Sequence, residues 1–91
     1  DMNRRELRGR DGVRSLTARE FALASELFSR PGEVLTRKQL LEAAWGAEFD
    51  RTRNVVDVYV GYLRAKLLEI GASDLEIRAV RGLGYRLSAK A

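Results

Sequence analysis

Apolar residues recur at helical spacing in three segments of the chain. The first segment repeats them at intervals of three or four residues: Phe21, Ala24, Leu27 and Phe28. The second does so over a shorter stretch: Leu40, Leu41, Ala44 and Trp45. The third is the longest and keeps one face apolar for about four turns: Val56, Val60, Leu63, Leu67 and Ile70. These patterns predict three amphipathic helices that bury their apolar stripes in a core.

Capping motifs mark where the first two helices begin. In "TARE", Thr17 takes the N-cap position and Glu20 follows three residues later. In "TRKQ", Thr36 and Gln39 stand in the same relation. Such a capping box satisfies backbone N–H groups that a helix start leaves free. Because Pro31 disfavours a helical conformation at the residue before it, the first helix is expected to end there.

Short strands are predicted at both ends of the chain. Asp11-Gly12 is a turn signal within Arg5–Leu16, whose charged arms indicate a short hairpin. After the third helix, which should end at Gly71, "EIRAV" and "GYRLS" supply two strands joined by Gly82-Leu83-Gly84. The segment Gly46–Thr52 has no helical period and is predicted to be a loop.

This order of elements predicts an α+β fold of the winged helix-turn-helix class, with three helices and a C-terminal β-hairpin wing. The 91 residues suffice for one small domain. Its parts are expected at residues 1–16 for the N-terminal hairpin, 17–70 for the three helices and 76–88 for the wing.

Composition excludes most enzyme classes. The chain has no cysteine and no histidine, which removes thiolate metal sites, disulfides and the usual general base. The carboxylates of its C-terminal part show no spacing that gathers them around a substrate: Asp57, Glu69, Asp74 and Glu76. We therefore expect no catalytic activity, no metal and no cofactor.

Charge is divided unevenly along the chain. Residues 1–50 hold 9 Lys/Arg and 9 Asp/Glu, whereas residues 51–91 hold 8 and 4, so the net charge of +4 lies in the C-terminal part. This excess indicates an anionic polymer or surface as partner, or a solvated basic face. No apolar run approaches the roughly 20 residues of a membrane span. Residues 1–15 are charged throughout, unlike a signal peptide, so a cytoplasmic location is expected.

The third helix has a nearly uncharged face opposite its apolar stripe. At about 100° per residue, that face carries Asn54, Val58, Gly61, Tyr62 and Ala65. Arg53 and Arg64 lie on one flank and Lys66 on the other. Such a face could read base edges in a major groove, because Asn can pair with adenine and apolar groups contact thymine methyls. It could equally face water or another subunit.

Gly82 and Gly84 allow two interpretations. Glycines beside Arg81 and Arg86 could cradle the phosphates of a nucleotide, but a third glycine is missing and a strand follows where a phosphate-binding helix should begin. A tight turn between two strands is the better interpretation. Loss of either glycine should then damage the turn if its φ is positive.

Four motifs together resemble the OmpR/PhoB-type winged-helix DNA-binding domain, the output module of many bacterial two-component response regulators. They are "LTAREF", "PGEVLTRKQLLEAAWG", "NVVDVYVGYLRAKL" and "IRAVRGLGYRL", spread over Leu16–Leu87. Each is weak alone, and their order and separation make the resemblance specific. It implies sequence-specific binding of double-stranded DNA in transcription regulation, in a bacterial cytoplasm.

The resemblance also implies roles for individual residues. The helix 54–70 would enter the major groove. Thr36 and Arg37 would approach the DNA backbone at a helix N-terminus. Trp45 matches a family position that packs near the DNA backbone. Arg81 in the wing would reach the adjacent minor groove or its phosphates. The loop carrying Glu48, Phe49, Asp50 and Arg51 matches the segment that meets RNA polymerase in activators of the family.

Phosphate contacts and base contacts would come from different side chains. Affinity is expected from Arg37, Arg64, Lys66 and Arg81. Specificity is expected from Asn54, Val58, Tyr62 and Ala65. Arg64 has a structural alternative, because Asp57 could pair with it or with Arg53. Lys66 lies close to the apolar stripe.

Two features depart from the family pattern. Gly61 and Tyr62 stand where members often carry basic residues, so arginine readout of guanine is missing there. The chain also starts late in the N-terminal sheet that follows the receiver domain in the family. We therefore expect an excised or incompletely ordered effector domain that lacks the receiver.

In the intact protein, a sensor kinase would phosphorylate that receiver and favour dimers on tandem half-sites. The isolated domain is expected to be a monomer that binds one half-site weakly. The alternative hypothesis is a winged-helix protein-interaction module, because the central face of the third helix carries so little charge.

Overall fold

A computed structural model describes residues 5–46, 54–72 and 74–89. Three helices form the centre: α1 (Ala18–Ser29), α2 (Arg37–Trp45) and α3 (Val55–Glu69). The strands are β1 (Glu6–Gly9), β2 (Gly12–Ser15), β3 (Val34–Thr36), β4 (Leu75–Val80) and β5 (Gly84–Ala89). This arrangement confirms the predicted α+β winged helix-turn-helix fold.

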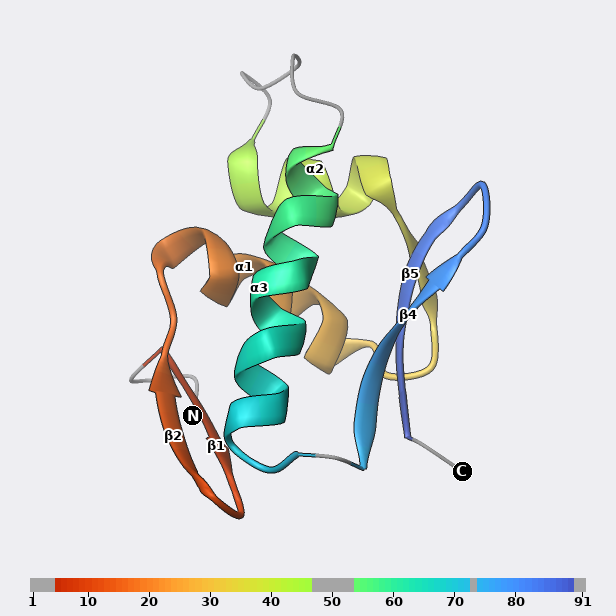
Figure 1. The fold of residues 1–91 in the computed structure, drawn as a ribbon. Helices are drawn as coiled ribbons and strands as arrows, with labels where there is room; N and C mark the ends of the chain where they lie inside the picture. The colour runs from red at the N-terminus through yellow and green to blue at the C-terminus, as the bar shows by residue number, and fades with distance from the viewer. Residues whose placement is uncertain (1–4, 47–53, 73, 90–91) are drawn as a thin grey trace.

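Two antiparallel sheets flank the helices. The β1–β2 hairpin lies beside the C-terminal end of α3, and the β4–β5 hairpin lies on the other side of that helix (Figure 1). The second sheet has the order β3-β5-β4, so β5 is central and β4 is an edge strand. The predicted hairpins are confirmed. The strand β3 was not predicted, because its three residues are too few to show an alternating pattern.

Both capping boxes form as predicted. The Thr17 hydroxyl accepts from the backbone N–H of Glu20 at 3.2 Å, while the Glu20 carboxylate accepts from the backbone N–H of Thr17 at 2.8 Å. Thr36 and Gln39 repeat this arrangement at the start of α2, with distances of 3.0 and 2.8 Å. The two helix starts are therefore fixed by local sequence.

The core joins the inward faces of all three helices to the second sheet. The apolar stripe of α3 is buried as predicted: Val56, Val60, Leu63, Leu67 and Ile70. In α1 the prediction for Phe28 is wrong, since that side chain is 38% exposed and Leu23 is buried instead. The stripe of α1 runs through Glu20, Leu23, Ala24 and Leu27, and this set turns Phe28 toward the solvent side of the helix.

Candidate nucleic-acid interface

The face of α3 that points away from the core is exposed as predicted. Its members are Asn54, Val58, Gly61, Tyr62 and Ala65. Val58 is 45% exposed and Tyr62 is 49% exposed, which are large fractions for apolar and aromatic side chains. Asn54 occupies the N-cap position without a capping hydrogen bond from its side chain. A major groove admits an α-helix, so an exposed helix face of this kind could contact base edges there.

The wing tip lies beside the start of α2. The backbone N–H of Arg37 donates to the carbonyl oxygen of Leu83 at 3.3 Å, which joins the first residue of α2 to the turn between β4 and β5. In Figure 1 the wing tip and the N-terminal end of α3 point toward the same end of the molecule. Arg81 is exposed in this turn. The N-terminal end of α3, the wing and the start of α2 therefore lie close together (Figure 1), since Asp57 in the first turn of α3 also contacts Arg37.

The two wing glycines have different functions in the fold. Gly82 has a φ of +77°, in the region that favours glycine, as the turn interpretation requires. Gly84 does not have a positive φ. A Cβ there would overlap the carbonyl oxygen of Leu35, because β3 and β5 pass very close together at this point. Gly84 therefore permits strand pairing, and Gly82 permits the turn.

Arg37 has protein partners at the surface. Its Nε donates to the Asp57 carboxylate at 3.1 Å, and its guanidinium lies 5.4 Å from the centroid of the Tyr85 ring. The Tyr85 hydroxyl donates to the same oxygen of Asp57. The hypothesis that Asp57 pairs with Arg64 is wrong, since its described partners are Arg37 and Tyr85. Arg53, the other suggested partner, lies outside the described residues.

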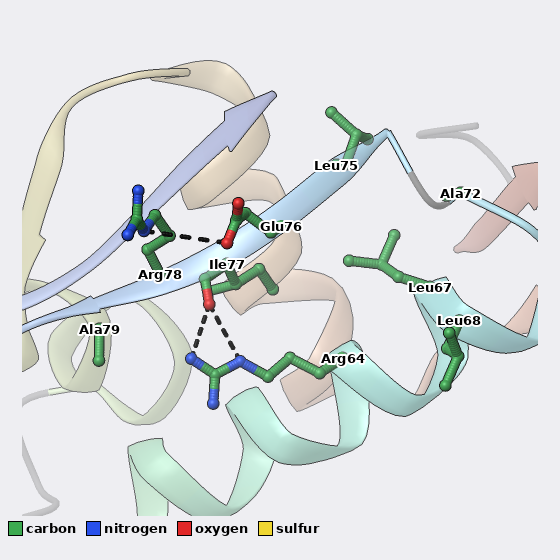
Figure 2. A pocket seen from close by; sticks show the side chains of 9 residues that line it. All are labelled: Arg64, Leu67, Leu68, Ala72, Leu75, Glu76, Ile77, Arg78 and Ala79. Atoms are coloured by element: carbon green, nitrogen blue, oxygen red, sulfur yellow. Dashed lines mark hydrogen bonds and ion pairs between the residues drawn. The ribbon is translucent and has the colours of Figure 1, made fainter. Parts of the chain in front are cut away.

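Arg64 braces α3 against β4. Its Nε and one terminal nitrogen donate to the carbonyl oxygen of Ile77 at 3.0 and 2.6 Å, as Figure 2 shows. Its guanidinium also lies 5.5 Å from the centroid of the Tyr85 ring. These contacts border a groove of about 460 Å³ between α3 and β4. Arg64 therefore has a structural function, as the alternative hypothesis expected, although its partner is Ile77 and not Asp57. A phosphate contact would have to use its remaining N–H groups.

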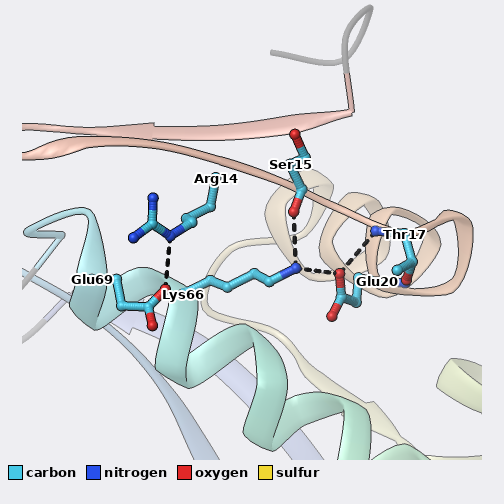
Figure 3. Close-up of polar contacts among 6 residues, drawn as sticks. All are labelled: Arg14, Ser15, Thr17, Glu20, Lys66 and Glu69. Carbon is cyan, nitrogen blue, oxygen red and sulfur yellow. Dashed lines mark hydrogen bonds and ion pairs between the residues drawn. The ribbon is translucent and has the colours of Figure 1, made fainter.

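Lys66 points toward α1 and β2. Its ammonium donates to the Glu20 carboxylate at 2.7 Å and to the carbonyl oxygen of Ser15 at 2.8 Å (Figure 3). Burial by itself would raise the pKa of Glu20. Hydrogen bonds from Lys66 and from the backbone of Thr17 outweigh that effect and lower the pKa below its ordinary value. The contact of Lys66 with phosphate stays a prediction, and its ammonium already donates to Glu20 and Ser15.

Trp45 is largely buried, in an aromatic row that reaches the exposed face of α3. The Trp45 and Tyr59 rings meet edge to face with centroids 5.1 Å apart, and Tyr59 and Tyr62 do the same. The Arg19 guanidinium lies 5.1 Å from the centroid of the Trp45 ring. Sequence reasoning missed the contacts of Arg19, Tyr59 and Tyr85, since only the tertiary arrangement brings these residues to their partners Trp45, Tyr62 and Asp57.

Other predicted features fall partly outside the structure. Glu48, Phe49, Asp50 and Arg51, predicted to meet RNA polymerase, lie outside the described residues.

Within the ranges 5–46, 54–72 and 74–89, no group of three or more carboxylate, cysteine or histidine side chains could hold a metal ion. In those same ranges no helix is long and apolar enough to cross a membrane.

Comparisons with known proteins agree on one family. Residues 11–87 match the family described as "Transcriptional regulatory protein, C terminal". Response regulator MprA of Mycobacterium leprae is 51% identical over 73 residues, which cover 80% of this chain and 32% of that protein. The chain therefore spans about a third of the length of the curated relatives it matches.

Solved DNA-binding domains have the same fold. The DNA-binding domain of Bacillus subtilis CssR superposes with a TM-score of 0.81 at 31% identity, covering 93% of this chain and 92% of that one. The DNA-binding domain of response regulator AdeR, solved in complex with an intercistronic region, gives 0.82 at 30% identity, covering 99% and 92%. The chain belongs to the transcriptional regulatory protein C-terminal family, the OmpR/PhoB-type winged-helix domains of response regulators, which bind DNA to regulate transcription.

Proposed function

We propose that the chain reads a specific sequence in double-stranded DNA by placing α3 in the major groove. The observation that carries this proposal is the exposed face of α3 beside the wing and the start of α2. Asn54 and Tyr62 supply hydrogen-bonding groups to base edges, while Val58 and Ala65 supply apolar contacts. Gly61 lets the helix backbone come close to the bases.

Backbone contacts come from the elements around that face. Arg81 in the wing is the main phosphate contact, and Arg37 and Thr36 approach the backbone at the N-terminus of α2. Arg64 adds a contact through its remaining N–H groups. Lys66 and Trp45 act mainly by fixing α3 and α2, because their polar and aromatic groups already have protein partners.

The whole protein would add control to this binding. We propose a receiver domain that a sensor kinase phosphorylates in the bacterial cytoplasm, and dimers that occupy tandem half-sites. The isolated domain binds one half-site as a monomer. In an activator, residues 48–51 would contact RNA polymerase. The named relative supports the receiver, because MprA is a response regulator about three times as long as the matched region.

A protein-interaction module is the second candidate. The low charge at the centre of the α3 face favours it, since Val58 and Tyr62 would suit an apolar partner. In that case α3 would dock on another protein instead of on DNA.

Selection of bound duplexes from a random pool tests the proposal. We expect enrichment of one half-site. In a titration at two salt concentrations, the logarithm of affinity should fall with the logarithm of salt by about 0.9 per phosphate contact. If no duplex from the pool binds with this salt sensitivity, the proposal is rejected in favour of the interaction module.

A further inference from the structure

One carboxylate joins the three elements that border the proposed interface. Asp57, in the first turn of α3, accepts from Nε of Arg37 at 3.1 Å and from the hydroxyl of Tyr85. Arg37 is the first residue of α2, and Tyr85 is the second residue of β5, directly after the wing turn. The three residues form a unit that we call the Asp57 clamp.

Two cations lie close to the aromatic ring of the clamp. The guanidinium groups of Arg37 and Arg64 lie 5.4 and 5.5 Å from the centroid of the Tyr85 ring. Tyr85 itself is buried, and the bond from Arg64 to Ile77 fixes the second cation. The ring therefore has little freedom to move. Its hydroxyl in turn fixes the Asp57 carboxylate that holds Arg37.

The Tyr85 phenol of the clamp is the hydrogen-bond donor to Asp57. Burial of the ring, and next the hydrogen bond to the Asp57 carboxylate, raise the pKa of the Tyr85 phenol. The phenol therefore stays protonated and donates its hydrogen bond to the Asp57 side chain, which also accepts from Arg37. The clamp thus pairs the cation of Arg37 with the acidic side chain of Asp57, and Arg64 adds a second cation beside the ring.

We propose that Asp57 is a positioning residue for DNA specificity, which fixes the guanidinium of Arg37 and offsets its charge. This inference rests on the DNA-binding function. A mobile cation strengthens binding to every sequence, because phosphate spacing does not depend on the bases. A cation held in one place favours the register in which α3 also meets its bases. Asp57 thus lowers non-sequence-specific binding and preserves the specific complex.

The test compares Asp57→Asn with Asp74→Asn in the 91-residue chain. Both substitutions remove one negative charge and keep the side-chain size, and Asp74 is exposed at the far end of α3, just before β4. The probes are a duplex carrying the selected half-site and a duplex of the same composition in scrambled order. Affinity for each is measured at several salt concentrations.

For Asp57→Asn we expect binding to the scrambled duplex to strengthen, with a salt slope steeper by up to about 0.9. The ratio of specific to scrambled affinity should fall by about threefold to tenfold. Asp74→Asn should leave this ratio within about twofold of the wild type. An equal rise in both affinities for Asp57→Asn, with the ratio unchanged, would overturn the inference.

Arg37→Lys separates position from charge. Lysine keeps the positive charge but loses the Nε–H that donates to Asp57 and the planar guanidinium that lies near the Tyr85 ring. The side chain of Arg37 is 42% exposed, so the variant should fold, which thermal unfolding would verify. We expect the specificity ratio to fall while the salt slope stays close to that of the wild type.

The outcomes separate this inference from the proposed function. An unchanged ratio in Arg37→Lys would attribute any effect of Asp57→Asn to charge alone and overturn the positioning function. Failure of the wild-type chain to bind any duplex with salt sensitivity would overturn DNA binding and this inference together. Normal wild-type binding with ratios insensitive to both substitutions would overturn this inference alone.

Discussion

The ammonium of Lys66 lies 2.7 Å from the carboxylate of Glu20, and this ion pair joins α3 to α1. Glu20 is only 4% exposed, and it also accepts from the backbone N–H of Thr17 as part of the capping box. Lys66 reaches the carbonyl oxygen of Ser15 in β2 as well. A single carboxylate therefore helps to fix the helix start, the N-terminal hairpin and the helix proposed to read DNA.

Glu20→Gln should destabilise the chain by about 2 kcal/mol, because it leaves the partly buried Lys66 ammonium without a counter-charge. The free energy of unfolding measured in urea gives the value. Glu69→Gln is the matched control, since Glu69 pairs with Arg14 at 2.9 Å on an exposed surface. An exposed pair contributes little, so the control should lose less than about 1 kcal/mol. Equal losses in the two variants would contradict a special contribution of Glu20.

The same pair makes stability depend on pH. The pKa of Glu20 is lower in the folded chain than its ordinary value of 4.5. Its charge therefore contributes stability that is fully present above about pH 4.5 and is lost as pH falls through the lowered value. Wild type should lose stability over this acid range, and Glu20→Gln should lose less of it. Parallel curves for the two proteins between pH 3 and 6 would show that Glu20 does not carry this dependence.

Features that depend on residues within one helix could be predicted from the sequence. The caps at Thr17 and Thr36 and the stripe of α3 depend on residues within one element, so their spacing was sufficient. The partners of Asp57 depend on how α2 and β5 pack against α3, and no spacing within the chain encodes that packing. Phe28 was misassigned because a helix stripe read from apolar residues alone overlooked the buried, paired Glu20 on the same face.

The close approach of β3 and β5 makes Gly84 intolerant of any side chain. Gly84→Ala should lower the free energy of unfolding by about 2 kcal/mol or more, because its Cβ would overlap the carbonyl oxygen of Leu35 and push the strands apart.

Gly61→Ala is the opposite case, since nothing lies within 4 Å of a Cβ there. Replacing this helix glycine should stabilise the chain by roughly 0.5–1 kcal/mol. Thermal unfolding of both variants gives the signs, and a stable Gly84→Ala would refute the close approach.

Arg81 tests the wing as a phosphate contact. Its side chain is exposed in the turn between β4 and β5, so Arg81→Ala should leave the unfolding temperature nearly unchanged. It should weaken binding to all duplexes about equally and lower the salt slope by about 1, because one phosphate contact is lost. Arg10→Ala removes the same charge from the exposed turn between β1 and β2 and should leave the slope unchanged. Equal effects of the two substitutions would show that Arg81 acts only through its charge, and the wing contact would be rejected.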